Sequence, residues 1–213
     1  MNHLITFLFL IPCIGFAQYS ENDWDERDKW MDTRVIFEMA GITKGSFVAD
    51  IGCHEGYLSV RLARKVGEDG RVYAVDVVES RLETLKENLK NRALFNVNTV
   101  LGDFDNPKLP KGTLDVVVIM DTYHEMKDYF TILRHAKDAL KPGGRIVIIE
   151  KLKTRVKGKS RDTQTDAHSL GTKYVKQELK KVGFNILNEN NNMGNWENDV
   201  DKVIWMLVAI KPK

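Results

Sequence analysis

The sequence predicts an α/β protein in which one doubly wound sheet is mostly parallel and ends in an antiparallel strand pair. Near-continuous β-branched runs at residues 114–120 and 145–149 are typical of strands buried on both faces of a parallel sheet. Segments with helical spacing of apolar residues separate such runs, and this alternation places helices on both faces of the sheet. A short Asn-rich link joins the last two apolar runs, 184–188 and 202–210, and suggests a hairpin.

Length and composition are those of one globular domain, which we expect to span residues 18–213. The chain has 213 residues, of which 43% are hydrophobic and 29% charged. Its net charge of +2 provides no general attraction to nucleic acid or to an anionic membrane. Nucleic acid is therefore not an expected partner, and the sequence does not indicate an oligomeric state.

The N-terminus predicts export. Residues 4–16 form an apolar run too short to span a bilayer comfortably, and small residues flank its last position. We expect a signal peptide over 1–17, cleaved after Ala17, and a periplasmic protein without a stable membrane span. No Lys or Arg precedes the apolar run, so an uncleaved anchor and a misassigned start codon remain alternatives. Cleavage would remove Cys13 and leave Cys53 as the one cysteine, which excludes an intrachain disulfide.

A tight turn after the first expected strand, 48–51, indicates a nucleoside cofactor. Gly52 allows the turn, and Gly56 lets a ligand or the next helix approach closely. Free backbone N–H groups at the start of that helix favour an anionic ligand group. His54 and Tyr57 stand where a dinucleotide-binding G-x-G-x-x-G sequence would have glycines, so a nicotinamide cofactor is not expected.

Two more strands end in acids. The strand at 71–76 ends in Asp76, about 20 residues after Gly56, the spacing at which a carboxylate meets ribose hydroxyls. An ordinary helix-capping Asp is the alternative. The strand at 97–101 leads into Gly102, Asp103 and Phe104.

Further helices are expected at 23–39, 126–140 and 174–181. The second of these has apolar residues at helical spacing and is closed by the Lys-Pro-Gly-Gly sequence of residues 141–144, which turns the chain into the next strand.

Together these features resemble class I S-adenosylmethionine-dependent methyltransferases over residues 22–212. The family motif D-x-G-x-G-x-G corresponds to Asp50, Gly52, His54 and Gly56, with a histidine in place of the middle glycine. The resemblance implies a Rossmann-like fold, S-adenosylmethionine as cofactor, and a hydrogen bond from the adenine amino group to Asp103. The cofactor-binding residues that it implies are Asp50, Gly52, His54, Gly56, Asp76, Asp103, Phe104 and Asp121.

The loop after the fourth strand is the expected catalytic segment. A methyl acceptor often needs a base, and His124 is the best candidate by intrinsic pKa. Asp121 or Glu125 would orient it or act in its place. Alternatively, His124 and Glu125 only begin the next helix. The loop lacks the N/D-P-P-Y sequence of methyltransferases that act on amino groups of bases.

Two features allow more than one interpretation. His54 either points away harmlessly or projects toward the cofactor; in the second case it joins His124, Asp121 and Glu125 in a cluster able to hold a divalent metal. Dispersed histidines and carboxylates are more often not ligands, so we predict no metal. Six basic residues at alternate positions of 151–161 would line one side of an extended chain and bind an acidic substrate, although a solvated loop is favoured.

The segment before the last predicted helix gives a loose further match. Asp162 and His168 resemble an Asp-x-His element of a group of exported predicted methyltransferases.

We therefore expect a methyltransferase that moves a methyl group from S-adenosylmethionine to a small-molecule or protein acceptor. A non-catalytic protein that binds S-adenosylmethionine or a nucleoside on the same fold is the alternative, suggested by the missing glycine. Export would place the chain where this cofactor is scarce, which adds weight to that alternative.

Overall fold

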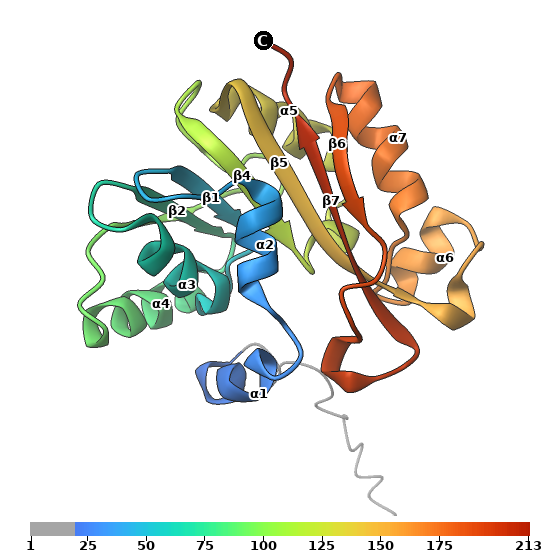
Figure 1. The fold of residues 1–213 in the computed structure, drawn as a ribbon, viewed down its shortest axis with the longest axis horizontal. Coiled ribbons are helices and arrows are strands. Elements are labelled where there is room, and N and C mark those ends of the chain that lie inside the picture. Colours follow the sequence, from blue (N-terminus) through green and yellow to red (C-terminus); the bar gives the residue numbers. More distant parts are fainter. Residues whose placement is uncertain (1–19) are drawn as a thin grey trace, which may run out of the picture.

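The computed structural model describes residues 20–213, which form a seven-stranded sheet covered by helices (Figure 1). The strand order is β3-β2-β1-β4-β5-β7-β6, and only β7 runs antiparallel to its neighbours. The strands are β1 Phe47–Ile51, β2 Arg71–Asp76, β3 Val97–Leu101, β4 Leu114–Met120, β5 Leu140–Lys153, β6 Asn185–Asn190 and β7 Lys202–Ile210. The predicted sheet and its C-terminal hairpin are confirmed.

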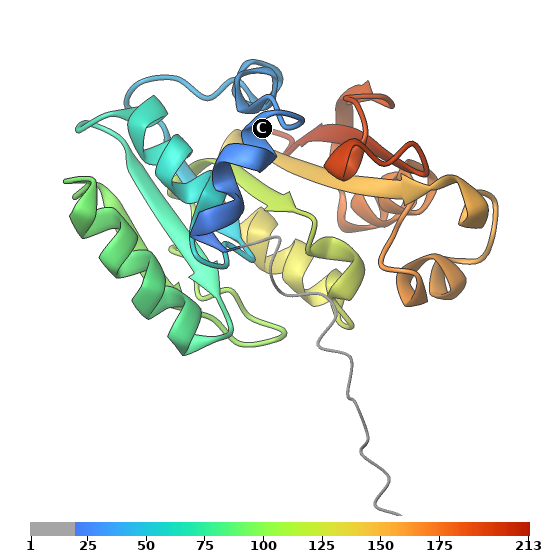
Figure 2. The ribbon, with the colours of Figure 1, turned by 90° about the horizontal axis from the view of Figure 1, so that it is seen from below.

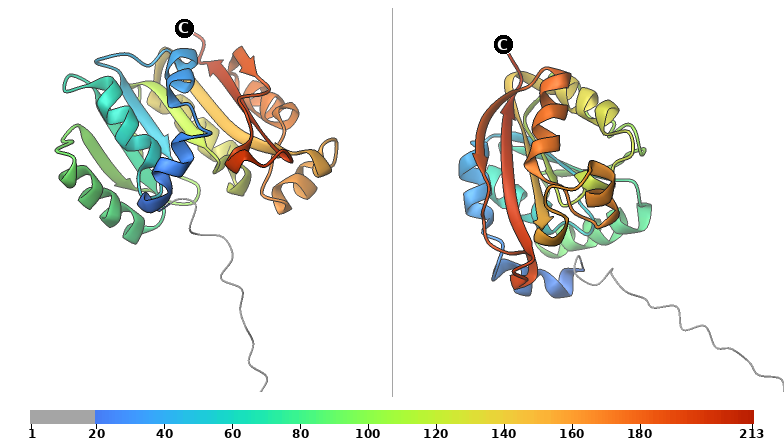
Figure 3. Two further views of the ribbon diagram at one scale, coloured as in Figure 1. Left: turned by 60° about the horizontal axis from the view of Figure 1, so that its bottom comes forward. Right: turned by 90° about the vertical axis from the view of Figure 1, so that its right-hand side faces the viewer.

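The helices are α1 Trp24–Asp28, α2 Thr33–Ala40, α3 Tyr57–Val66, α4 Glu79–Asn91, α5 Tyr129–Ala139, α6 Arg161–Asp166 and α7 Thr172–Val182. Five of them, α2 to α5 and α7, cover the two faces of the sheet. One core cluster joins α2, α3 and α4 to the sheet, and a second joins α5 and α7 to the opposite face. The right-hand view of Figure 3 shows α2 and α7 on opposite sides of β7. Within residues 20–213, no helix has the length and apolarity needed to cross a membrane.

The single helix expected at 23–39 is wrong in detail, because the chain breaks into α1 and α2. Asp32 has an extended conformation and its side chain accepts a hydrogen bond from the Arg34 backbone N–H, so it starts a new helix. The two pieces pack in different places. Helix α2 buries Ile36 and Phe37 in the core, whereas α1 lies at the edge of the sheet where the parallel strands end, at the bottom of Figure 1.

The basic segment after the fifth predicted strand is neither an extended arm nor wholly a solvated loop. Strand β5 continues to Lys153 because β7 pairs with it as far as that residue. Lys151 is buried and bonded to Asp121, while Arg161 begins α6 and its Nε lies 2.7 Å from a carboxylate oxygen of Glu178. The alternate basic residues therefore do not form one surface.

Candidate active site

The candidate site lies at the edge where the parallel strands end, which Figure 2 views from below. The turn after β1 is tied to β2, since the backbone N–H groups of Gly52 and Cys53 donate to the Val75 carbonyl at 2.8 and 3.0 Å. The same turn abuts the loop after β4, because a Cβ added to Gly52 would lie 2.5 Å from the Thr122 side chain. The turn after β1 thus meets the end of β2 and the loop after β4, at the edge of the sheet where ligands bind in such folds.

The glycine turn keeps its backbone shape despite the histidine within it. Gly52, His54 and Gly56 have φ values of 81°, 50° and 98°. Left-handed conformations are inexpensive for glycine but cost a side-chain-bearing residue about 1–2 kcal/mol. A Cβ on Gly56 would also lie 2.2 Å from Leu85 of α4. His54 is half-buried rather than turned fully outward.

Asp76 anchors this turn. Its carboxylate is buried and accepts the backbone N–H groups of His54 at 2.9 Å and Val78 at 3.0 Å, while Arg81 lies 3.6 Å away. Each carboxylate oxygen has two lone pairs, so both can accept a further hydrogen bond from a ribose hydroxyl.

Asp50 faces α3. The Ser59 hydroxyl donates to its buried carboxylate at 2.6 Å. Burial raises the pKa of Asp50 to about 6, and the hydrogen bond from Ser59 opposes that rise. Asp50 therefore links the end of β1 to α3. Its contact with the cofactor stays a prediction.

Exposed apolar side chains stand at or just after the ends of β2 and β3. Val77, Leu101 and Phe104 are 38%, 45% and 85% exposed, and they follow or end the neighbouring strands β2 and β3. Asp103 lies in the same loop and accepts a hydrogen bond from Lys108 at 2.9 Å. An uncovered apolar surface next to acceptor groups is suited to the flat ring of a nucleoside. These residues therefore fit an adenosine-containing cofactor.

A buried histidine–carboxylate pair follows β4. His124 lies in the short 3-10 turn η3, Tyr123–Glu125, and its Nδ1 is 3.0 and 2.9 Å from the two carboxylate oxygens of Glu150. Its backbone N–H donates to Glu150 as well, at 3.0 Å. Burial lowers the pKa of His124, but the carboxylates of Glu150 and Asp121 together outweigh this effect, and the net pKa is above the ordinary 6.5.

The carboxylate that contacts His124 Nδ1 is thus Glu150. The sequence indicated Asp121 or Glu125 for this role. Asp121, in a left-handed conformation with φ 53°, forms a buried ion pair with Lys151. Glu125 lies on the other side of the imidazole, 3.8 Å from Nε2. Glu150 had one signal in the sequence, a carboxylate at the end of an otherwise apolar strand.

An aromatic cluster closes this edge. Trp196, in the link between β6 and β7, is buried, and both Arg27 Cζ and Lys151 Nζ lie within 4.7 Å of its ring centroid. Trp30 packs on the same ring at 4.7 Å, and Trp24 packs edge-on to Tyr57 at the start of α3. Part of the Asn-rich link between β6 and β7 is therefore buried and meets α1 beside Lys151.

Two groups among the described residues have donor atoms close enough together to hold a metal ion. One joins His124, Glu125 and His168; the other joins Asp121, His124 and Glu150. His54, which the sequence suggested as a member, belongs to neither. His168 was singled out in the sequence but not assigned to this cluster.

The strand order, the glycine turn after β1 and the acid at the end of β2 define a class I S-adenosylmethionine-dependent methyltransferase fold. The chain belongs to the methyltransferase domain family, whose model matches residues 42–204. The predicted methyltransferase family is confirmed.

Individual relatives agree with this assignment. A demethylmenaquinone methyltransferase of Lactococcus lactis is 34% identical over 125 residues, which are 59% of this chain and 49% of that protein. The chain spans about half the length of the curated relatives it matches.

Solved structures share the fold. An S-adenosylmethionine-dependent methyltransferase from Aquifex aeolicus has a TM-score of 0.73 and 23% identity, with 87% of this chain and 92% of that chain covered. A phosphoethanolamine N-methyltransferase from Haemonchus contortus, in complex with S-adenosyl-L-methionine, has a TM-score of 0.71 and 17% identity, with 92% of this chain and 58% of that chain covered.

Proposed function

We propose that this protein transfers the methyl group of S-adenosylmethionine to an acceptor atom that must lose a proton, on a small molecule or an exposed protein group. The observation that carries the proposal is the buried pair of His124 and Glu150. An acceptor that is already nucleophilic, such as a neutral amine, would not need this pair.

The cofactor would lie along the ends of β1, β2 and β3. Asp76 would accept the ribose hydroxyls, and Asp103 with Phe104 would hold the adenine ring. The helix N-terminus after Gly56 would face the carboxylate of the methionine part. When bound, S-adenosylmethionine supplies an electrophilic methyl group on a positively charged sulfur.

His124 would take the acceptor proton. Its Nδ1 faces the two carboxylate oxygens of Glu150. An ionised carboxylate can accept hydrogen bonds but cannot donate them, so Nδ1 carries the proton of the neutral ring. Nε2 of that ring then has a free lone pair. Transfer of the methyl group to the acceptor would leave the electron pair of the broken carbon–sulfur bond on sulfur, and the acceptor proton would move to His124 Nε2. Glu150 then stabilises the imidazolium.

The acceptor is to be sought among hydroxyl, thiol and acidic carbon compounds. The curated relatives are named demethylmenaquinone methyltransferases, so a demethylmenaquinone is the first acceptor to test.

We also propose that the chain is exported and cleaved after Ala17. The apolar run at 4–16 and the small residues around its end support this. Residues 1–19 lie outside the part of the chain that the structure describes.

The test uses the chain of residues 18–213. Calorimetry with S-adenosylmethionine and S-adenosylhomocysteine measures binding, and methyl-labelled S-adenosylmethionine with demethylmenaquinone or a cell extract reveals a methylated product. Product formation that depends on His124 supports the proposal. Tight binding of both ligands without any product would instead establish a non-catalytic binding protein.

A further inference from the structure

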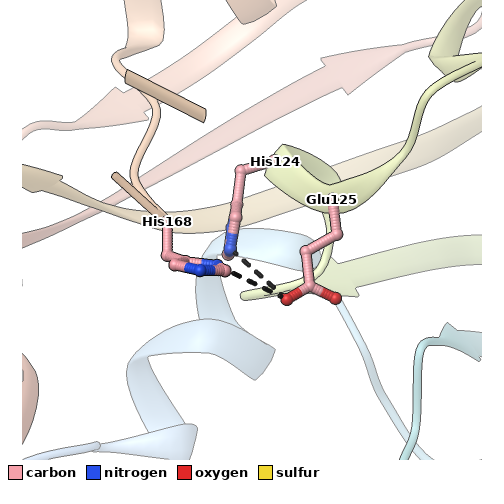
Figure 4. Close-up of side chains that lie close together, drawn as sticks. All are labelled: His124, Glu125 and His168. Carbon is pink, nitrogen blue, oxygen red and sulfur yellow. Dashed lines mark ion pairs between the residues drawn. The ribbon is translucent and has the colours of Figure 1, made fainter. Parts of the chain in front are cut away.

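Three side chains from two separate loops point at one another beside the histidine–carboxylate pair (Figure 4). The Glu125 carboxylate lies to one side of two histidines: its Oε1 is 3.8 Å from His124 Nε2 and 3.8 Å from His168 Nδ1 (Figure 4). The two imidazole rings stand nearly perpendicular, at 87°, with their centroids 5.8 Å apart. All three donor atoms lie within 4.8 Å of one another.

Glu150 prepares His124 for this arrangement. The Glu150 carboxylate accepts a hydrogen bond from Nδ1 of the neutral His124 ring, so the lone pair of that ring is on Nε2. Nε2 is the atom that faces Glu125. A carboxylate behind the imidazole is the usual partner of a metal-binding histidine, since it sets the tautomer and the ring orientation.

The geometry points to a binding site for a divalent first-row metal ion, held by His124 Nε2, the Glu125 carboxylate and His168 Nδ1. Two imidazole nitrogens and one carboxylate suit Zn²⁺ or Co²⁺ rather than Mg²⁺ or Ca²⁺, which prefer oxygen ligands. Three protein ligands leave a coordination position open, as in catalytic zinc sites.

Small side-chain movements suffice to bring the donors into bonding range. Ligands about 2.0–2.2 Å from a tetrahedral zinc ion lie somewhat over 3 Å apart, against the 3.8 Å distances observed here. The side chains of Glu125 and His168 are 61% and 70% exposed, so both can adjust, and an ion can reach them from solvent.

The loop that carries His168 is attached to β5. Ser169 donates its hydroxyl to the Lys151 carbonyl at 3.2 Å and accepts the Lys153 backbone N–H at 2.8 Å. Gln164 of α6 is buried and accepts the Gly171 backbone N–H at 2.8 Å. The backbone of His168 is thereby held beside the end of β5, the strand that also carries Glu150.

The alternative group of Asp121, His124 and Glu150 is a poorer site. All three residues are buried, Lys151 already neutralises Asp121, and Glu150 is engaged by the ring and the backbone N–H of His124. A metal ion there would have to displace the ammonium group of Lys151. The exposed group needs no such displacement.

The catalytic consequence rests on the proposed function. An acceptor hydroxyl or thiol bound at the open position would lose its proton to solvent, because a bound cation stabilises the anion. His124 Nε2 would then bind the ion instead of receiving the acceptor proton, and the rest of the transfer would be unchanged.

The test is a titration of the chain of residues 18–213 with Co²⁺, followed by visible absorption. We expect one ion per chain, with the absorption bands of a four- or five-coordinate site.

His168→Gly removes one ligand and suits the left-handed backbone there, φ 49°. It should weaken Co²⁺ binding more than Glu150→Gln, for which loss of an outer hydrogen-bond partner predicts about 10- to 100-fold. His135→Ala, in α5 outside the cluster, is the matched control and should bind Co²⁺ like the unchanged protein.

Two results would overturn the metal site: no Co²⁺ bound, or equal Co²⁺ affinity in the His168→Gly variant. S-adenosylhomocysteine calorimetry on the same variants keeps the two proposals distinguishable. Methyl transfer by metal-free protein would exclude the ion from catalysis and leave the proposed function standing. A Co²⁺ site in a protein without transfer activity would support the metal site and refute the proposed function.

Discussion

Both carboxylate oxygens of Glu150 lie within 3.0 Å of the Nδ1 atom of His124, and both residues are buried. The pair spans neighbouring parallel strands, because His124 follows β4 and Glu150 lies in β5. If this contact orients the ring, Glu150→Gln should lower kcat for methyl transfer while cofactor affinity stays unchanged.

The loss should be smaller than that of His124→Gln, for which we expect about 10²- to 10⁴-fold, the usual contribution of a positioned base. Steady-state kinetics with the identified acceptor and calorimetry on each variant measure both quantities. A Glu150→Gln protein with full kcat would remove Glu150 from catalysis.

Asp76→Ala should weaken S-adenosylmethionine binding by about 1–3 kcal/mol, the cost of leaving polar partners unpaired. Part of the loss arises because the backbone N–H groups of His54 and Val78 lose their acceptor. Calorimetry is the measurement, and Asp105→Ala, an exposed acid in the loop after β3, is the control. Equal affinities for the Asp76→Ala variant and the unchanged protein would exclude Asp76 from the site.

His54→Gly tests whether the missing glycine matters. The turn already has the backbone conformation that glycine favours, so we expect both affinity and kcat to change by less than about tenfold. Tighter binding beyond that limit would show that the imidazole obstructs the cofactor. A lower rate at unchanged affinity would show that it contributes to the transition state.

Asp50 should make the protein less stable as pH rises. Its pKa is about 6 in the fold against an ordinary 3.8, so the folded state holds this proton more tightly than the unfolded chain does. The associated stability is fully present below about pH 3.8 and is lost as pH rises through about 6, a difference of about 3 kcal/mol.

Urea unfolding of Asp50→Asn and of the unchanged protein at pH 4 and pH 8 provides the measurement. The variant should gain relative stability at the higher pH. Ser59→Ala removes the hydrogen bond that lowers the pKa of Asp50, so this variant should lose more stability between pH 4 and pH 8 than the unchanged protein. A stability difference between the Asp50→Asn variant and the unchanged protein that is independent of pH would contradict the assigned shift.

Export predicts a chain that begins near Gln18 outside the cytoplasmic membrane of the source cell. Fractionation followed by N-terminal sequencing of the recovered protein is the measurement. Recovery of the full-length chain in the cytosolic fraction would refute this proposal without affecting the enzymatic one.

The sheet was predictable because its strands are local signals. The runs at 114–120 and 145–149 are apolar on both faces, and the glycine turn and Asp76 stand at fixed distances along the chain. The break between α1 and α2 was missed because a single capping residue, Asp32, decides it.

The site was predictable only in part, because its decisive contacts join residues far apart in sequence. His124 and Glu150 are 26 positions apart and meet through the register of β4 with β5. His168 reaches Glu125 because the segment after α6 returns to β5, and no periodicity in the sequence encodes that return.

Cys53 has a consequence for how the protein can be made. It is the one cysteine among residues 20–213, its thiol is buried, and burial raises the pKa of this thiol well above its ordinary value. Since the thiolate is the form that reacts with oxidants and disulfides, this sulfur resists cross-linking between molecules. The domain therefore needs no oxidative folding machinery, and production in a reducing or an oxidising compartment should yield the same monothiol species.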